Sequence, residues 1–111
     1  MLDIWENRQG EIVVLALNGK FDAATAPLFE ERLRPMIEQG DRNFLFDLAH
    51  LDYISSAALR RLLLLAKRAD EAGGKVVLLS VQSHLLEIFD MAGFTQLFPI
   101  YSSQEEALRS F

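Results

Sequence analysis

Short apolar runs of strand type alternate with amphipathic runs of helical type along the chain, and this alternation limits the fold more than any other feature. Apolar strands that alternate with helices form a mostly parallel sheet, whose faces the helices cover. We therefore predict an α/β fold in one domain over residues 1–111, with a mixed, mostly parallel sheet of about five strands covered by about four helices. The strand-like runs are 4–8, 11–18, 43–48, 75–81 and 97–101, and the helical runs are 21–40, 56–72, 83–93 and 102–111.

Local signals set the ends of several of these elements. Gln9-Gly10 lies between the first two strand-like runs and predicts a two-residue turn, hence an antiparallel hairpin. Thr25 is the expected cap of the first helical run. Ser102 followed by Glu105 predicts a capping box for the last one. The apolar side of the first helix is expected to carry Leu28, Phe29, Leu33, Met36 and Ile37.

Composition excludes several classes of protein. A chain of 111 residues is long enough for one core but not for two. The net charge of −5 argues against a nucleic-acid partner, which selects a basic surface. The absence of cysteine excludes disulfides and thiolate metal sites and favours a cytoplasmic location. We expect neither a membrane partner nor a signal peptide, because no apolar run approaches the roughly 18 residues of a membrane span and no compact apolar block begins the chain.

An enzyme or metal site would have to use the acidic residues at the ends of the predicted strands. Asp22, Asp47 and Asp52 all lie where α/β folds usually place ligands, and such a cluster could hold Mg²⁺. A phosphoacceptor site of that kind also needs two adjacent acids after an early strand and a lysine after a late one, and the late segment "FPIYSS" offers no lysine. His50 and His84 are far apart in the sequence and belong to no Ser-His-Asp pattern. We predict no catalytic centre, no cofactor and no metal.

Two adjacent serines, Ser55 and Ser56, separate an apolar run from the leucine-rich helix that follows. One interpretation is that a serine caps the helix, since its hydroxyl accepts a hydrogen bond from a free N–H of the first turn. The other is that a hydroxyl at this point is modified, because the positive field of a helix N-terminus favours a phosphate. The residues alone leave both interpretations open.

The helix after the serines has one leucine on its charged side. At 100° per residue, Leu64 falls among the cations Arg60, Arg61, Lys67 and Arg68. A single exposed leucine is ordinary in a soluble protein. An exposed leucine ringed by cations on an acidic domain is also a candidate docking patch, and the helix by itself does not separate the two. The opposite side is expected to carry Leu59, Leu62, Leu63, Ala66 and Ala69.

Three stretches of the sequence resemble the STAS domains, and among them the short bacterial anti-sigma factor antagonists. They are "NGKFDAATAPLFEERL", "NFLFDLAHLDYISSAALRRLLLLAKRADEAGGKVVLLSV" and "LLEIFDMAGFTQLFPIYSSQEEAL". The middle stretch resembles the family pattern of a strand ending in Asp-Leu, a short loop, and Asp-Ser-Ser-Gly-Leu at the start of a helix. The resemblance covers nearly the whole chain and implies the STAS fold.

The resemblance assigns roles to residues at the start of this helix. Ser56 falls on the family's phosphoacceptor serine and Leu59 on its buried leucine. Ser55 stands where many members carry aspartate and offers a second, competing hydroxyl. Ala58 stands where glycine is usual, so the loop is expected to be set slightly differently. Asp22 keeps the place of the family's aspartate before the first helix.

The resemblance implies a binding protein without catalytic activity. Family antagonists, when unphosphorylated, sequester an anti-sigma factor that is also an ATP-dependent serine kinase, and a serine phosphatase restores them after phosphorylation. The alternative is an accessory STAS subunit of a transporter or sensory complex, in which Ser56 is only a cap. The oligomeric state stays open, with a weak homodimer as one option. The expected partner contacts are Asp22, Asp52, Ser55, Ser56, Arg60, Arg61 and Leu64.

Overall fold

A computed structural model describes residues 1–91, 93 and 98–111. The described residues form one six-stranded sheet in the order β1-β2-β3-β5-β6, with β4 paired to the end of β2. Among these strands only β1 and β2 pair antiparallel, so the predicted α/β fold with an opening hairpin is confirmed. The elements are β1 Leu2–Gln9, β2 Ile12–Phe21, α1 Ala26–Glu38, β3 Asn43–Asp47, β4 Leu51–Ile54, α2 Ser56–Glu71, β5 Lys75–Leu79, α3 Ser83–Met91, β6 Ile100–Tyr101 and α4 Gln104–Arg109.

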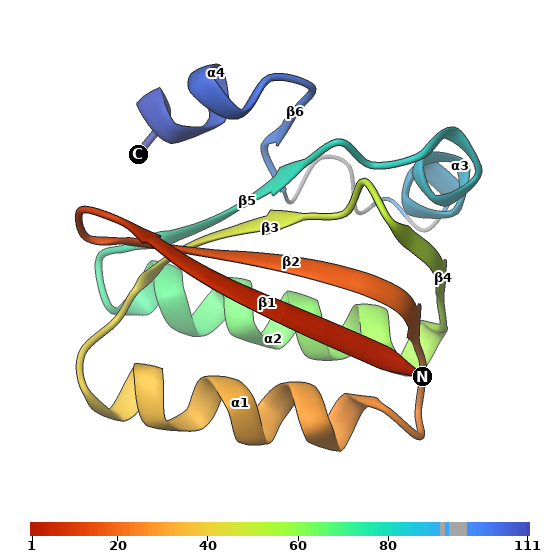
Figure 1. The fold of residues 1–111 in the computed structure, drawn as a ribbon, viewed down its shortest axis with the longest axis horizontal. Coiled ribbons are helices and arrows are strands. Elements are labelled where there is room, and N and C mark those ends of the chain that lie inside the picture. Colours follow the sequence, from red (N-terminus) through yellow and green to blue (C-terminus); the bar gives the residue numbers. More distant parts are fainter. Residues whose placement is uncertain (92, 94–97) are drawn as a thin grey trace.

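The helices form layers on the two sides of the sheet (Figure 1). Helices α1 and α2 run side by side along one face, and α4 lies over the opposite face. Alternate residues of each strand point to opposite faces, so the sheet contributes side chains to two clusters of buried apolar residues, one on each face. On β3, Phe44 and Phe46 join the large cluster under α1 and α2, whereas Leu45 joins a smaller one with Ala107 of α4. The layering therefore follows directly from the strand pattern.

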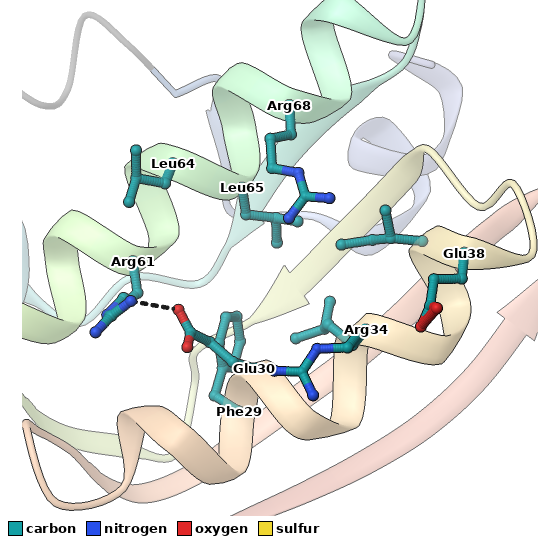
Figure 2. A pocket seen from close by; sticks show the side chains of 10 residues that line it. Phe29, Glu30, Arg34, Glu38, Arg61, Leu64, Leu65 and Arg68 are labelled. Atoms are coloured by element: carbon teal, nitrogen blue, oxygen red, sulfur yellow. Dashed lines mark hydrogen bonds and ion pairs between the residues drawn. The ribbon is translucent and has the colours of Figure 1, made fainter.

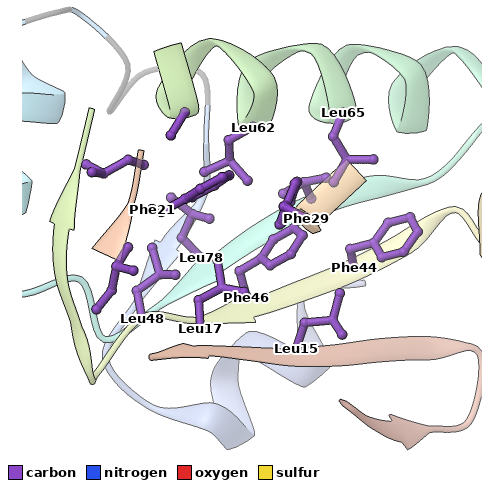
Figure 3. Close-up of a cluster of buried hydrophobic side chains, with 14 of the residues drawn as sticks. Leu15, Leu17, Phe21, Phe29, Phe44, Phe46, Leu48, Leu62, Leu65 and Leu78 are labelled. Carbon is purple, nitrogen blue, oxygen red and sulfur yellow. The ribbon is translucent and has the colours of Figure 1, made fainter. Parts of the chain in front are cut away.

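Aromatic rings fill the centre of the large cluster (Figure 3). The ring of Phe29 on α1 lies 4.7 Å from that of Phe21 and 5.6 Å from that of Phe46, measured between centroids. Such separations are typical of favourable tilted aromatic pairs. Phe29 thus joins α1 to the ends of β2 and β3, and this fixes where the turn between β2 and α1 lies.

The start of the chain is tied to the end of β2. The N–H of Lys20 donates to the carbonyl oxygen of Met1 at 2.9 Å. Gly19, the residue before Lys20, has φ +101°, and a Cβ at this position would collide with the carbonyl oxygen of Met1. Only glycine adopts this positive φ and allows this close approach of the backbone without strain. Met1 consequently lies at the same end of the sheet as the serines (Figure 1).

Several expected details are corrected by the structure. The hairpin turn is Gly10-Glu11, one residue later than predicted, because Gln9 pairs with Ile12. The last helix is capped by Ser103, whose hydroxyl accepts from the N–H of Glu106 at 3.4 Å, so the predicted capping box was wrong by one residue. Residue 97 of the predicted strand 97–101 and residue 92 of the predicted helix 83–93 lie outside the described residues.

Two further expectations about α1 and the serine loop were wrong. Leu28 is 53% exposed and faces away from the core, because the buried side of α1 runs through Ala26, Phe29, Leu33 and Met36. The segment before the serines was expected to be a loop, but it contains strand β4, which pairs with the end of β2 across a register shift between Gly19 and Lys20. The four residues of β4, Leu-Asp-Tyr-Ile, do not alternate between buried and exposed positions, so they carry no strand period.

Candidate functional site

The turn that enters α1 and the turn that enters α2 lie side by side at the end of the sheet where strands β2 and β4 finish. We call this end of the sheet the site edge. The N–H of Ser55 donates to the carbonyl oxygen of Phe21 at 2.9 Å, which continues the pairing of Phe21 with Ile54 between β2 and β4. This places Asp22, the next residue after β2, beside the two serines. The structure therefore brings together residues that lie more than thirty positions apart in the sequence.

Ser55 is the cap of α2. Its backbone is extended, with φ −85° and ψ 165°, and its hydroxyl accepts a hydrogen bond from the N–H of Ala58 at 3.1 Å. The side chain is half-buried. A hydroxyl engaged in this way satisfies one of the free N–H groups of the first helical turn. The capping interpretation is thus correct for the first serine of the pair.

Ser56 has a different environment. It is the first residue of α2, its side chain is exposed, and its hydroxyl has no hydrogen-bond partner among the described residues. Arg60 follows one helical turn later, also exposed and without an ion pair within the described part of the chain. Ala58 lies inside the helix and is fully buried, so this helix start does not need the glycine that is usual in the family. Of the two serines, Ser56 is therefore the one whose hydroxyl is free among the described residues.

Asp22 closes the turn before α1 together with Thr25. One carboxylate oxygen of Asp22, Oδ1, accepts from the N–H groups of Ala24 and Thr25, each at 3.0 Å. In return the Thr25 hydroxyl accepts from the N–H of Asp22 at 2.9 Å and donates to the carbonyl oxygen of Lys20 at 3.0 Å. Thr25 occupies the N-cap position of α1, as predicted, but its side chain makes no capping hydrogen bond to a helical N–H.

These hydrogen bonds stabilise the ionised form of Asp22. The N–H of Thr25 is the main cause that lowers the pKa of the Asp22 carboxyl, and the Thr25 hydroxyl and the N–H of Ala24 act in the same direction. Partial desolvation acts the other way and is outweighed. The second carboxylate oxygen, Oδ2, accepts no hydrogen bond from the described residues. Asp22 is a negatively charged group at the edge of the site with one oxygen available to a partner.

The start of α3 holds strand β4, which carries Asp52 on its exposed side. The side-chain amide of Gln82 donates to the carbonyl oxygens of Ala49 and Leu51 at 2.9 Å each. The ring nitrogen Nε2 of His84 lies 2.9 Å from the carbonyl oxygen of Asp52. Sequence reasoning missed the role of Gln82, because a single glutamine far along the chain carries no pattern.

Leu64 lies where the helical phase places it. Its side chain is 49% exposed, whereas that of Leu65 is 6% exposed. The predicted apolar side of α2 left out Leu65, and Leu63 on that side is only half-buried, because the buried side of the helix is rotated towards Ala58 and Leu65. Arg61 donates to Glu30 of α1 at 2.7 Å, so one of the four cations around Leu64 is paired.

The carboxylates considered for a metal do not come together. The described residues hold no group of three or more His, Asp or Glu side chains with the geometry of a metal site. Asp47 instead accepts from the N–H of Ala49 at 3.1 Å and shapes the turn after β3. None of the described helices combines the length and the apolar character that a membrane crossing requires.

The family model for the STAS domain matches residues 6–107. The chain belongs to the STAS domain family. A relative in Bordetella bronchiseptica, BtrV, is named as a candidate anti-sigma factor antagonist. It is 37% identical to this STAS domain over 100 residues, which cover 90% of this chain and 86% of the relative.

Solved structures share the STAS fold of this chain. A candidate anti-sigma factor antagonist from Thermotoga maritima superposes with a TM-score of 0.91 at 18% identity, covering 96% of this chain and 92% of the other. The anti-sigma factor antagonist SpoIIAA of Bacillus, in its unphosphorylated form, gives a TM-score of 0.84 at 18% identity and covers 97% and 95% of the two chains. At this identity the likeness supports the fold alone.

Proposed function

We propose that this STAS domain is an anti-sigma factor antagonist, a cytoplasmic binding module that a phosphate on Ser56 switches off. The observation that carries the proposal is the division of roles between neighbouring serines: Ser55 is engaged as a cap, whereas Ser56 is exposed and free. The names of the relatives support the class of function. The domain itself binds its partner and carries out no catalysis.

The helix start can accept a phosphate without refolding. A phosphoserine adds roughly −1.5 to −2 charge and three acceptor oxygens. At the first residue of α2 that charge meets the free N–H groups and the positive end of the helix dipole. The domain therefore tolerates the modification, and a partner docked on this edge experiences the change instead.

The partner's loss of affinity follows from electrostatics. Asp22 already places negative charge beside the two serines, and Arg60 is an exposed cation without an ion pair among the described residues. A phosphate on Ser56 makes the local charge around Arg60 negative. A partner surface that complements the unphosphorylated site edge then meets repulsion or an unpaired desolvated charge. Such mismatches cost on the order of several kcal/mol, which corresponds to a few decades in affinity.

The proposed partners are an anti-sigma factor with serine kinase activity and a serine phosphatase. The kinase would transfer the γ-phosphoryl group of ATP to the Ser56 hydroxyl: the Ser56 oxygen bonds to the γ-phosphorus, ADP leaves, and the hydroxyl proton passes to a base of the kinase or to water. The phosphatase would hydrolyse the ester. The partner contacts that we propose are Asp22 after β2, Ser55, Ser56 and Arg60 at the start of α2, Asp52 on β4, and Arg61 and Leu64 farther along α2.

Phosphate mapping on the natural protein tests the proposal. The chain is purified from its own cells, and the peptide from Leu51 to Arg60 is sequenced by mass spectrometry with site localisation. We expect a phosphorylated fraction on Ser56. Complete absence of phosphate from this peptide under all growth conditions, together with a stable complex that ATP does not dissociate, would favour the scaffold role instead.

A further inference from the structure

A groove runs along the seam between α1 and α2, on the side of these helices that faces away from the sheet (Figure 2). It consists of two hollows of about 290 and 220 Å³ that share Ile37, Leu65 and Arg68. Along α2 it reaches from Arg61 to Ala72, which is about 16 Å at 1.5 Å per residue. We call it the seam groove. Its length is that of about three helical turns.

The floor of the seam groove is apolar. Phe29 and Leu33 of α1 and Leu65 of α2 form it, and these side chains are held in place by the core behind them. Leu64, 49% exposed, forms the outer lip on α2. An apolar floor with an exposed leucine at its lip is typical of grooves that receive the apolar side of a helix. A third helix can pack over the seam of two others in the same way as helices pack within bundles.

The charges on the rim favour one kind of partner. Arg61 and Glu30 neutralise each other across one end of the groove (Figure 2). Beyond that pair, Arg34 on α1 and Arg68 on α2 line opposite sides, and neither forms an ion pair with another described residue. Glu38 and Asp41 are the remaining acids of the two hollows, and Asp41 is paired with Arg8 at 2.7 Å. The unpaired charges of the rim are therefore two arginines and one glutamate, on a chain of net charge −5. The groove therefore complements an acidic ligand.

We propose that the seam groove is a docking site for an acidic amphipathic helix of a partner protein. The apolar side of that helix covers Leu64 and the floor, and acidic residues on its flanks pair with Arg34 and Arg68. The proposal rests on the proposed binding function and deepens it, because it names the structural element through which a partner is held. It does not depend on the phosphate switch, since the groove begins more than one helical turn beyond Ser56.

Synthetic helical peptides test the groove directly. The probe is a lactam-stapled peptide of about fifteen residues with leucines three and four positions apart and glutamates on both flanks. Its matched control has lysine at every glutamate position. We expect fluorescence anisotropy to show at least about tenfold tighter binding of the acidic peptide. Leu64→Glu should abolish that binding while the protein stays folded by circular dichroism.

A charge reversal with a matched control separates the groove from general attraction. Arg68→Glu should weaken binding of the acidic peptide and strengthen binding of the basic one. Arg109→Glu changes the charge equally and also in the last turn of a helix, but on α4, and it should alter neither affinity. Equal effects of the two variants, equal binding of both peptides, or no binding of either would overturn the proposal. So would a dimer in sedimentation velocity that Leu64→Glu dissociates, because the occupant would then be a second copy.

The outcome is distinguishable from that of the proposed function. The assay contains neither kinase nor ATP, and it is run on the unphosphorylated chain and on Ser56→Ala, which should bind the peptides equally. If the unphosphorylated domain does not bind the acidic peptide, but phosphate mapping finds phosphate on Ser56, the groove is refuted and the switch stands. If the acidic peptide binds, but phosphate mapping finds no phosphate on Ser56, the groove stands and the switch is refuted.

Discussion

Ser55 and Ser56 are neighbours in the chain, yet only the hydroxyl of Ser55 is bound within the described part of the domain, to the N–H of Ala58 at 3.1 Å. The hydroxyl of Ser56 is directed to the surface at the first residue of α2. Two identical side chains therefore have separate environments: one holds the helix start and the other is exposed without a hydrogen-bond partner among the described residues. This separation leads to predictions for each serine on its own.

Removing the cap should cost stability, whereas removing the free hydroxyl should not. Ser55→Ala leaves the N–H of Ala58 without its partner and should lower the free energy of unfolding by about 1 kcal/mol. Ser56→Ala changes an exposed side chain and should shift it by less than about 0.5 kcal/mol. Urea denaturation of the two variants measures both values. A larger loss for Ser56→Ala than for Ser55→Ala would reverse the assignment of cap and free serine.

Asp22 should make stability depend on pH in the acid range. Because hydrogen bonds lower the pKa of its carboxyl in the folded state, the ionised form stabilises the domain above the pKa of the unfolded chain, near pH 4. That contribution is lost as the pH falls through the lowered folded pKa. Asp22→Asn should be less stable than the natural protein at pH 7 and approach it under acid conditions. Thermal melts of both proteins from neutral to acid pH check this prediction. A difference in melting temperature that stays constant at every pH would show that ionisation of Asp22 is not the cause.

Leu64 and Leu65 should respond differently to the same change. Leu64→Glu alters an exposed side chain and should leave the free energy of unfolding within about 0.5 kcal/mol. Leu65→Glu buries a carboxylate in the cluster under α1 and α2 and should unfold the domain or raise the pKa of the new carboxyl strongly. Circular dichroism and urea titration separate the cases. If Leu64→Glu unfolds the protein, Leu64 belongs to the core.

Gly19 should tolerate no side chain. Gly19→Ala places a Cβ against the carbonyl oxygen of Met1 and forces alanine into a left-handed φ of +101°. We expect a lower melting temperature and faster amide hydrogen exchange at Lys20, whose N–H bonds to Met1. Gly10→Ala is the matched control, because its φ is also positive but a Cβ there meets open space. Equal losses in the two variants would show that φ strain, and not the close approach to Met1, sets the cost.

The sequence was sufficient for the parts of the fold that depend on local pattern. The alternation of apolar runs predicts the layers, and the 100° phase places Leu64 outside the core. Strand β4 was missed because its four residues become a strand only by pairing with the end of β2, a tertiary contact that no local period reports. The exposure of Leu28 was missed because α1 is buried along a narrower arc than its apolar residues suggest.

The candidate site was predictable only in part. The resemblance to a family pointed to Ser56, but the sequence did not say which serine was the cap, since either residue meets the requirement. That choice depends on the backbone at Ser55, which the pairing of β4 with β2 sets. Arg34 and Arg68 carried no signal as a pair, because they face one groove only once α1 packs beside α2. Residues that act across two elements are visible only in the folded chain.

The most direct test of the central claim measures binding of the chain's own anti-sigma factor before and after phosphorylation of Ser56. The factor is captured from native cells on immobilised Ser56→Ala protein, identified, purified and titrated by calorimetry against the unphosphorylated domain, the phosphorylated domain and Ser56→Ala. A switch at Ser56 predicts tight binding of the first and third and a loss of affinity of about a hundredfold or more for the second. Equal affinity of the phosphorylated and unphosphorylated domains for this factor would contradict it.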